Sequence, residues 1–209
     1  NENAKFALDG NYSKLRKENN RKIYHLLAKG NLIDQYLGFT ISVQDTNRNV
    51  LENIDRPDVG WDEHVKIIRE LKEHYPDRFC KIQLIQGLPG QTLLTWRETL
   101  KQVSKEDVYI QTFVNEFLPT SPAAGKGYQE KYNFSYSGSE RINGSQQVFR
   151  GKFAESCYSF SKKDFLEMTL LTVIYNALIV LRSNLKMYDF FDIEFFVDTF
   201  LASKYYEDL

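Results

Sequence analysis

The sequence is poor in cysteine, and its thiols are badly placed for a metal cluster or a disulfide framework. It has two cysteines among 209 residues, Cys80 and Cys157, and neither belongs to a C-x-x-C or C-x-x-x-C-x-x-C pattern. Zinc ribbons and iron–sulfur clusters need several cysteines at such spacings, so this chain alone predicts neither. Disulfide scaffolds of secreted proteins are much richer in cysteine, and two unpaired thiols in a reducing cytoplasm are favoured.

The chain also lacks an excess of charge of one sign. It carries 27 Lys and Arg against 28 Asp and Glu, a formal net charge of −1. Proteins that bind nucleic acid through bulk electrostatics are usually basic, so we expect no nucleic-acid partner. The three histidines, His25, His64 and His74, form no H-x-x-H or H-x-x-x-H pair. A histidine metal site is therefore not expected.

Targeting and membrane signals are missing as well. The first eight residues have no basic segment followed by an apolar run, so they do not predict a signal peptide. The one long apolar run, residues 165–181, contains Glu167 and Asn176. A membrane span needs about 20 largely apolar residues, so this run predicts a buried or partner-facing helix instead. We expect a cytoplasmic protein without membrane contact and, because Asn1 is not an initiator methionine, further residues before it.

What the sequence does contain is a repeated alternation of strand and helix patterns. Hydrophobic residues make up 42% of the chain, enough for a sizeable core. Short connections between such β-α units predict parallel strands joined by right-handed crossovers, in either a doubly wound sheet or a (β/α) barrel. The predicted strands are residues 5–8, 37–44, 81–86 and 108–114, and the predicted helices are residues 13–29, 61–75 and from Thr92 or Thr95 to 103.

The composition changes after Pro119. Residues 120–151 are rich in Ser, Gly, Asn, Gln and Tyr, and they predict a long irregular excursion. A short strand is expected at 153–160, and Ser161 begins a capping-box pattern that opens a helix to Leu181. A last helix is expected at 190–206. We therefore divide the chain into residues 1–119, an α/β part, and residues 120–209, a loop-rich and then helical extension.

Candidate binding residues gather where the predicted strands end, which is where parallel α/β folds bind ligands. Gln44, Gly87 and Glu116 follow strands directly, and Asp9 follows the first partial strand. Around Pro89, two glycines predict a tight turn, and Gly87, lacking Cβ, could let a flat ring approach the backbone. An ordinary strand-to-helix turn explains the same letters equally well.

Gln44 and Arg56 form a second candidate pair. An arginine after the short helical turn at residues 50–54 could reach back over the strand ends and bind a carboxylate, while the Gln44 amide could bind an amino-acid or ribose group. Taken alone, both are more often surface residues. No catalytic acid or base is assigned. Cys157 and four tyrosines could carry a radical or donate a proton, but such residues are more often packing or surface residues. These tyrosines are Tyr109, Tyr128, Tyr132 and Tyr136.

Together these segments resemble the half of a radical S-adenosylmethionine (radical SAM) domain that follows its cluster loop. Residues 41–56 resemble the superfamily's "SVQ…vL…i.R" segment, residues 82–92 resemble its "dlIxGLPGqT" segment, and residues 108–119 resemble its last barrel strand. The resemblance covers about residues 4–122. Residues 150–181 resemble the cobalamin-associated branch, in which "S..D" and a long helix follow a Ser-rich strand end.

This resemblance implies the later strands of a parallel partial (β/α) barrel and a site for S-adenosylmethionine (AdoMet). It implies that Gln44 and Arg56 bind the ribose and the amino-acid carboxylate of AdoMet. Gln83 stands where many relatives have Asp, which puts its ribose contact in doubt. The remaining implied contacts are Gly87, Leu88, Pro89 and Glu116 near the adenine, and Asp9 at a polar position after the family's third strand.

The implied activity is cleavage of AdoMet to a 5′-deoxyadenosyl radical by a [4Fe-4S] cluster. The likeness of residues 150–181 to the cobalamin-associated branch adds the expectation of a cobalamin-linked methyltransferase that acts on a small molecule or peptide. The cluster cysteines are expected upstream of Asn1 or on a partner chain. A second hypothesis is a non-catalytic half-barrel that docks a partner chain carrying the cluster. A third, a barrel fragment of an unrelated hydrolase or lyase, has only the β-α order behind it.

Overall fold

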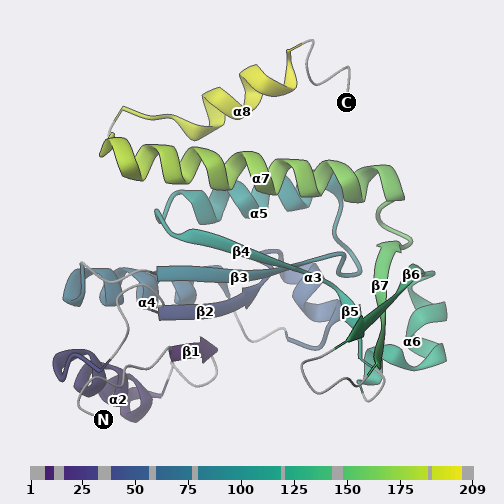
Figure 1. Ribbon diagram of the computed structural model, residues 1–209, viewed down its shortest axis with the longest axis horizontal. Coiled ribbons are helices and arrows are strands. Elements are labelled where there is room, and N and C mark those ends of the chain that lie inside the picture. The colour runs from purple at the N-terminus through teal and green to yellow at the C-terminus, as the bar shows by residue number, and fades with distance from the viewer. Residues whose placement is uncertain are drawn as a thin grey trace.

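The computed structural model describes residues 8–11, 17–32, 39–56, 60–76, 80–118, 121–142, 148–187 and 190–203. In these residues a parallel sheet carries helices, and a small antiparallel sheet lies beyond the strand ends (Figure 1). The predicted boundary at residues 119 and 120 falls outside the described residues, as does most of the first predicted strand.

The larger sheet is parallel throughout, with strand order β1-β2-β3-β4. This confirms the repeated β-α order and the parallel strands. The elements in chain order are β1 (Leu8–Asn11), α2 (Glu18–Lys29), β2 (Phe39–Gln44), α3 (Arg48–Asn53), α4 (Trp61–His74), β3 (Cys80–Gln86), α5 (Leu93–Ser104) and β4 (Tyr109–Val114).

The helix ends follow the capping signals in the sequence. Helix α2 ends at Lys29 before Gly30, and α4 ends at His74 ahead of Pro76. At the start of α5, Thr92 and Thr95 form a reciprocal capping box, so both predicted start residues take part.

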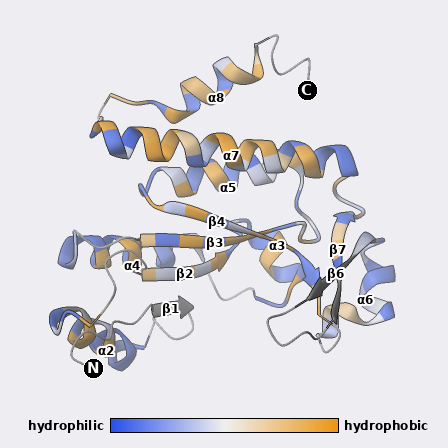
Figure 2. Ribbon diagram, viewed as in Figure 1, coloured by the Kyte–Doolittle hydropathy of each residue, from blue (hydrophilic) through white to orange (hydrophobic). Residues whose placement is uncertain are grey.

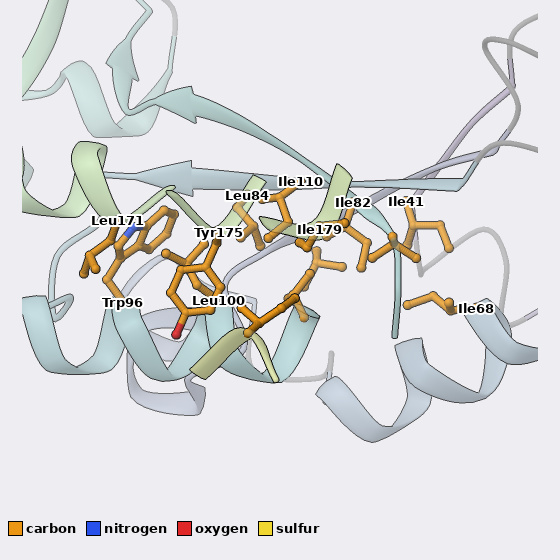
Figure 3. Close-up of a cluster of buried hydrophobic side chains, with 14 of the residues drawn as sticks. Ile41, Ile68, Ile82, Leu84, Trp96, Leu100, Ile110, Leu171, Tyr175 and Ile179 are labelled. Atoms are coloured by element: carbon orange, nitrogen blue, oxygen red, sulfur yellow. The ribbon is translucent and has the colours of Figure 1, made fainter. Parts of the chain in front are cut away.

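One face of the parallel sheet forms the core. Along β2, β3 and β4, alternate residues point toward the helices, and Ile41, Ile82 and Ile110 are almost completely buried there. Trp96 of α5 is fully buried against them, and its indole N–H donates to the Met168 carbonyl at 3.1 Å. Figure 3 shows side chains from α4, α5 and the long helix α7 (Lys162–Leu185) packing on these strands.

The opposite face is more polar. Ser42, Gln83 and Gln111 stand level with one another on neighbouring strands and are half-buried. The Ser42 hydroxyl donates to Gln83 Oε1 at 2.7 Å, and Gln83 Nε2 donates to Gln111 Oε1 at 3.2 Å. The sheet therefore has an apolar face under helices and a face crossed by a row of hydrogen-bonded amides.

The irregular excursion predicted for residues 120–151 is wrong, because its described part is mostly regular structure. A second sheet has the order β5-β7-β6, with antiparallel pairs. Its strands carry many serines and charged residues, of which Ser135, Ser137 and Lys152 are exposed, and this loop-like composition hid them. The elements are β5 (Glu116–Phe117), a short 3₁₀ helix (Pro122–Ala124), α6 (Lys126–Lys131), β6 (Ser135–Ile142) and β7 (Val148–Ser156).

Helix α7 begins with the predicted capping box at Ser161 and Asp164, and it runs four residues beyond the predicted end at Leu181. Figure 2 shows apolar and polar residues mixed along it. By length and composition it could cross a membrane; Met168 and Tyr175 are fully buried in this core, and 28% of its most apolar stretch is buried. The last helix, α8 (Ile193–Leu201), lies within the predicted range 190–206.

Asn176 of α7 closes the outer edge of the sheet. β4 is the edge strand, and the Asn176 side chain accepts from the Ile110 N–H at 3.1 Å and donates to the Ile110 carbonyl at 2.8 Å. The amide thus replaces a neighbouring strand at this residue.

We expect Asn176→Leu, which keeps the volume, to lower the free energy of unfolding by about 1–3 kcal/mol, because two buried backbone groups lose their partners. Urea denaturation measures this. Asn184→Leu, on an exposed position of the same helix, is the matched control and should change stability by less than about 0.5 kcal/mol. Equal effects of the two substitutions would contradict this role for Asn176.

Candidate functional site at the strand tips

Gln44 ends β2 in an unusual conformation. Its φ is 71°, in the left-handed region, and the pairing with β3 shifts register between Ser42 and Gln44. Its side-chain Oε1 is buried and has no hydrogen-bond partner among the described residues. An unsatisfied buried acceptor costs about 1–3 kcal/mol, so this atom is suited to a ligand that donates a hydrogen bond.

The turn that follows β3 requires both of its glycines. Gly87 and Gly90 have φ values of 91° and 95°. A Cβ on Gly87 would lie 3.2 Å from the Phe165 ring and 3.4 Å from Ala154, and one on Gly90 would lie 2.6 Å from Asn53 Nδ2. The missing Cβ atoms therefore make room for this chain's own side chains.

The backbone groups of this turn are largely bonded within the chain. Gln91 Oε1 accepts from the Gly87 and Leu88 N–H groups at 2.7 and 3.0 Å. Asn115 donates to the Gly87 carbonyl, and the Gly90 N–H donates to Ser159. Leu88 and Pro89 are themselves buried. A ring that binds here must meet other atoms of the turn, and the predicted adenine contact stays a prediction.

A buried carboxylate ties the tips of β2 and β3 together. Asp45, only 2% exposed, accepts from Gln91 Nε2 at 2.6 Å, from the Thr99 hydroxyl at 3.0 Å and from the Asn47 N–H at 2.7 Å. Burial raises the pKa of Asp45 above its usual value, although these hydrogen bonds act in the opposite direction. Because Gln91 also holds the glycine turn, Asp45 positions that turn through it.

Helix α3 brings the segment with Arg56 to the same place. Asn53, its last residue, donates to the Pro89 carbonyl at 3.0 Å. The chain then leaves the helix through Asp55, with φ of 59°, and the Arg56 N–H bonds back to the Leu51 carbonyl at 2.7 Å. The Arg56 side chain is partly exposed and forms no ion pair with a described residue.

The other predicted residues lie apart from this cluster or engage elsewhere. The Gln83 amide takes part in the row with Ser42 and Gln111. The backbone of Asp9 pairs beside Thr40 at the sheet edge, and its side chain lies outside the described part of the chain. Glu116 lines a cavity beyond the end of β4. The structure thus brings together the tips with Gln44, Arg56 and the glycine turn, and places Glu116 elsewhere.

Sequence reasoning missed the residues that hold the site in shape. Asp45, Asn53, Gln91 and Asn115 all bond to the turn or to one another through side chains. A signal was present, because each directly follows a strand, a helix end or the glycine turn. Polar residues in such places are common, and only the fold shows that these four meet.

The described residues do not fit an iron–sulfur cluster. No group of three or more His, Cys, Asp or Glu among them could hold a metal ion. Cys80 is buried in β3, and burial raises its pKa to about 12, so it remains a thiol rather than the thiolate that a metal binds. Gln44, by contrast, with its orphaned buried oxygen, fits a hydrogen-bonding organic ligand.

These features define an α/β protein with a parallel sheet, core helices on its apolar face and a polar site at the strand tips. Over 110 residues, the chain is 28% identical to the cobalamin-dependent radical SAM methyltransferase TokK of Streptomyces tokunonensis, a match that spans 51% of this chain and 16% of TokK. No protein-family model matches the sequence.

The fold is similar to that of coproporphyrinogen III oxidase (HemN) from Escherichia coli, a radical SAM enzyme. The TM-score is 0.53 at 20% identity, over 86% of this chain and 33% of HemN. The chain thus spans well under half of either protein. The partial homology to TokK supports the radical SAM superfamily, C-terminal half, as the motifs indicated, and the likeness to HemN shows a shared fold.

We expect Gly90→Ala to destabilise the protein by at least about 1–2 kcal/mol, because alanine is strained at this φ and its Cβ would collide with Asn53. Gly127→Ala is the matched control, since it lies in α6 with open space around it and should be neutral or stabilising by up to about 1 kcal/mol. Thermal unfolding of both variants measures this, and a harmless Gly90→Ala would contradict the geometry of the turn.

The raised pKa of Asp45 predicts a pH dependence of stability. Between the usual value of 3.8 and the raised pKa, the folded protein holds this proton more tightly than the unfolded chain does. The contribution of Asp45 to stability is therefore fully present below 3.8 and is lost as pH rises through the folded pKa. Asp45→Asn should remove this pH-dependent contribution of Asp45 to stability. The difference between the free energies of unfolding of wild type and variant should therefore change between pH 3.8 and the raised pKa. Parallel pH curves from urea denaturation would refute it.

Proposed function

We propose that this chain is the C-terminal half of a radical SAM catalytic domain and that it binds AdoMet at the tips of β2 and β3. The observation that carries the proposal is Gln44, whose buried amide oxygen lacks a partner among the described residues. It ends a strand beside a glycine turn held in a fixed shape. The homology to TokK and the shared fold with HemN support the same proposal.

A partial (β/α) barrel is the proposed architecture. In such a barrel, helices cover the outer face of each parallel strand and the inner face lines the ligand site. In the described residues, the core helices pack on the face with Ile41, Ile82 and Ile110, and the row of Ser42, Gln83 and Gln111 occupies the other. This division between the faces supports the barrel.

We assign the following roles to this chain's residues. Gln44 binds a donor group of the AdoMet ribose or amino acid, and Arg56 pairs with the AdoMet carboxylate. Gln83 and Asp9 stand on the neighbouring strands as further polar contacts. Asp45 and Gln91 touch no ligand and keep the turn containing Leu88 and Pro89 in place beside β2.

The described residues supply neither the ligands of the iron–sulfur cluster nor the identity of the substrate. When bound, a reduced [4Fe-4S] cluster would provide the electron that cleaves AdoMet to a 5′-deoxyadenosyl radical. We place its cysteine ligands on an upstream region or a partner chain. The name of TokK motivates the finer proposal of a cobalamin-linked methyltransferase, active in the cytoplasm on a small molecule or peptide.

A non-catalytic assembly domain is the second candidate, favoured by exposed apolar side chains on and near the last two helices. Phe190 is 86% exposed, Phe195 63% and Val173 61%. In this role the half-barrel would dock a chain that carries the cluster and would itself bind no AdoMet.

Calorimetry with AdoMet on the full-length, cluster-loaded protein tests these alternatives. We expect Gln44→Ala and Arg56→Ala each to weaken binding about tenfold or more, because a hydrogen bond to a charged group contributes about 1.5–3 kcal/mol. Arg48→Ala removes an exposed arginine that is ion-paired with Glu52 on α3 and is the matched control, with unchanged affinity expected.

Formation of 5′-deoxyadenosine under reducing conditions then tests the activity. The wild-type protein should cleave AdoMet and the Arg56→Ala variant should require a higher AdoMet concentration. Binding that neither site substitution alters, or a cluster-loaded protein that cleaves no AdoMet, would favour the assembly domain.

A further inference from the structure

A cavity of about 700 Å³ lies beside the last strand of the parallel sheet, outside the cluster of Gln44 and the glycine turn. Its walls come from the end of β4, from β5, β6 and β7, and from the start of α7. Aromatic and aliphatic side chains dominate it, among them Val114, Phe153, Phe165 and Leu166. Its volume is in the range of small-molecule sites, which are about 300–1,000 Å³.

The cavity lies mainly on the helix side of the sheet, although Phe113, on the same face of β4 as Gln111, also lines it. Thr112 and Val114, which line it, alternate along β4 with Gln111, and the helix-facing Ile110 precedes them in the same alternation. Phe165 and Leu166 belong to α7, which packs on that face. Most of the cavity therefore lies across β4 from the row of Ser42, Gln83 and Gln111.

Two oxygen atoms in the cavity wall lack partners. Thr112 Oγ1 and Glu116 Oε1 are buried, and neither forms a hydrogen bond with a described residue. The two side chains come from β4 and from β5, only four residues apart in the chain. The Glu116 oxygen can only accept a hydrogen bond when the carboxyl group is ionised, whereas the Thr112 hydroxyl can accept or donate, so a ligand that donates hydrogen bonds can satisfy both atoms.

The charged residues in the cavity wall indicate which charge the donating group of a ligand should carry. Glu155 and Lys162 also line the cavity and form an ion pair at 3.2 Å, which cancels their charges. Glu116 forms no ion pair with a described residue, so its carboxyl group is the ionisable group of the lining that is left without a charged partner. A cationic N–H donor complements it, whereas a carboxylate or phosphate would be repelled.

We propose that this cavity binds a compact apolar molecule bearing a primary amine, with the ammonium group on Glu116 and Thr112 and the apolar body against Phe153, Phe165 and Leu166. Glu116, which the motif resemblance placed near adenine, is a substrate-binding residue in this assignment. The cavity adjoins the proposed AdoMet site because Ala154 and Phe165 line it and also pack against Gly87. Its role as the substrate site rests on the proposed function, but amine binding does not.

Titration of the purified protein with three probes of similar size tests the charge preference. The probes are phenethylamine, neutral 2-phenylethanol and anionic 3-phenylpropionate, with binding followed by NMR chemical shifts. We expect phenethylamine to bind at least tenfold more tightly than the other two. Glu116→Gln should abolish this preference, and Leu166→Trp, at a side chain that is 61% exposed, should block all three probes by filling the entrance.

Glu98→Gln is the matched control, since it removes an exposed carboxylate on α5 and should leave phenethylamine binding unchanged. Equal affinities for the three probes, or the same loss from Glu98→Gln as from Glu116→Gln, would overturn the proposal. Competition of adenosine with phenethylamine would also overturn it, because Glu116 would then belong to the nucleoside site. AdoMet calorimetry on the same sample separates the amine-binding proposal from the proposed function. Normal AdoMet binding without amine binding would contradict only the amine-binding proposal.

Discussion

The buried hydrogen bond between the Asp45 carboxylate and the Gln91 amide is the constraint on which the site depends. It joins two strand tips that are far apart in the sequence, and the other end of the Gln91 amide holds the N–H groups of the glycine turn. A carboxylate that is 2% exposed is costly to bury unless its oxygens are satisfied. The arrangement is therefore stable only when the ends of β2 and β3 and helix α5, which supplies Thr99 from its middle, are all in place.

The same turn also connects the parallel sheet to the part of the chain beyond residue 120. Ser159 accepts from the Gly90 N–H, and Asn115, which is bonded to the Gly87 carbonyl, accepts from the Ala154 N–H through its own carbonyl. Farther along, α7 supplies Met168 and Tyr175 to the core of the parallel sheet. The extension therefore shapes the strand-tip site and the core, rather than being attached beside them.

The sequence predicted the parallel sheet well because its signals are local and strong. The apolar runs of β2, β3 and β4 end at polar or glycine residues, and the capping residues Thr92 and Ser161 mark helix starts with short-range hydrogen bonds. The second sheet was missed because β6 and β7 are partly exposed hairpin strands, whose serines and charges resemble a loop. Their pairing depends on contacts across the chain, which a local pattern does not contain.

The candidate site could be predicted only in part, for a related reason. Gln44, the glycine turn and Arg56 stand out by their place after strands and by their motifs. That Gly87 makes room for Phe165, or that Asn53 contacts Pro89, depends on residues between 36 and 78 positions away, which meet only in the fold. Motif spacing identified which residues gather at the tips, but not which atoms remain available to a ligand.

The lack of a Cβ on Gly87 has a consequence for how two ligands could be coupled. Ala154 and Phe165 lie 3.4 and 3.2 Å from the position that a Cβ would take, and both also form part of the wall of the Glu116 cavity. Closely packed interiors transmit small displacements, because side chains have little free volume to absorb them. A molecule that displaces the Phe165 ring therefore acts on the turn that Asp45 and Gln91 hold beside Gln44. The wall of the cavity and the strand-tip site are thus in contact at Gly87, through Phe165, Ala154 and the hydrogen bonds of Asn115.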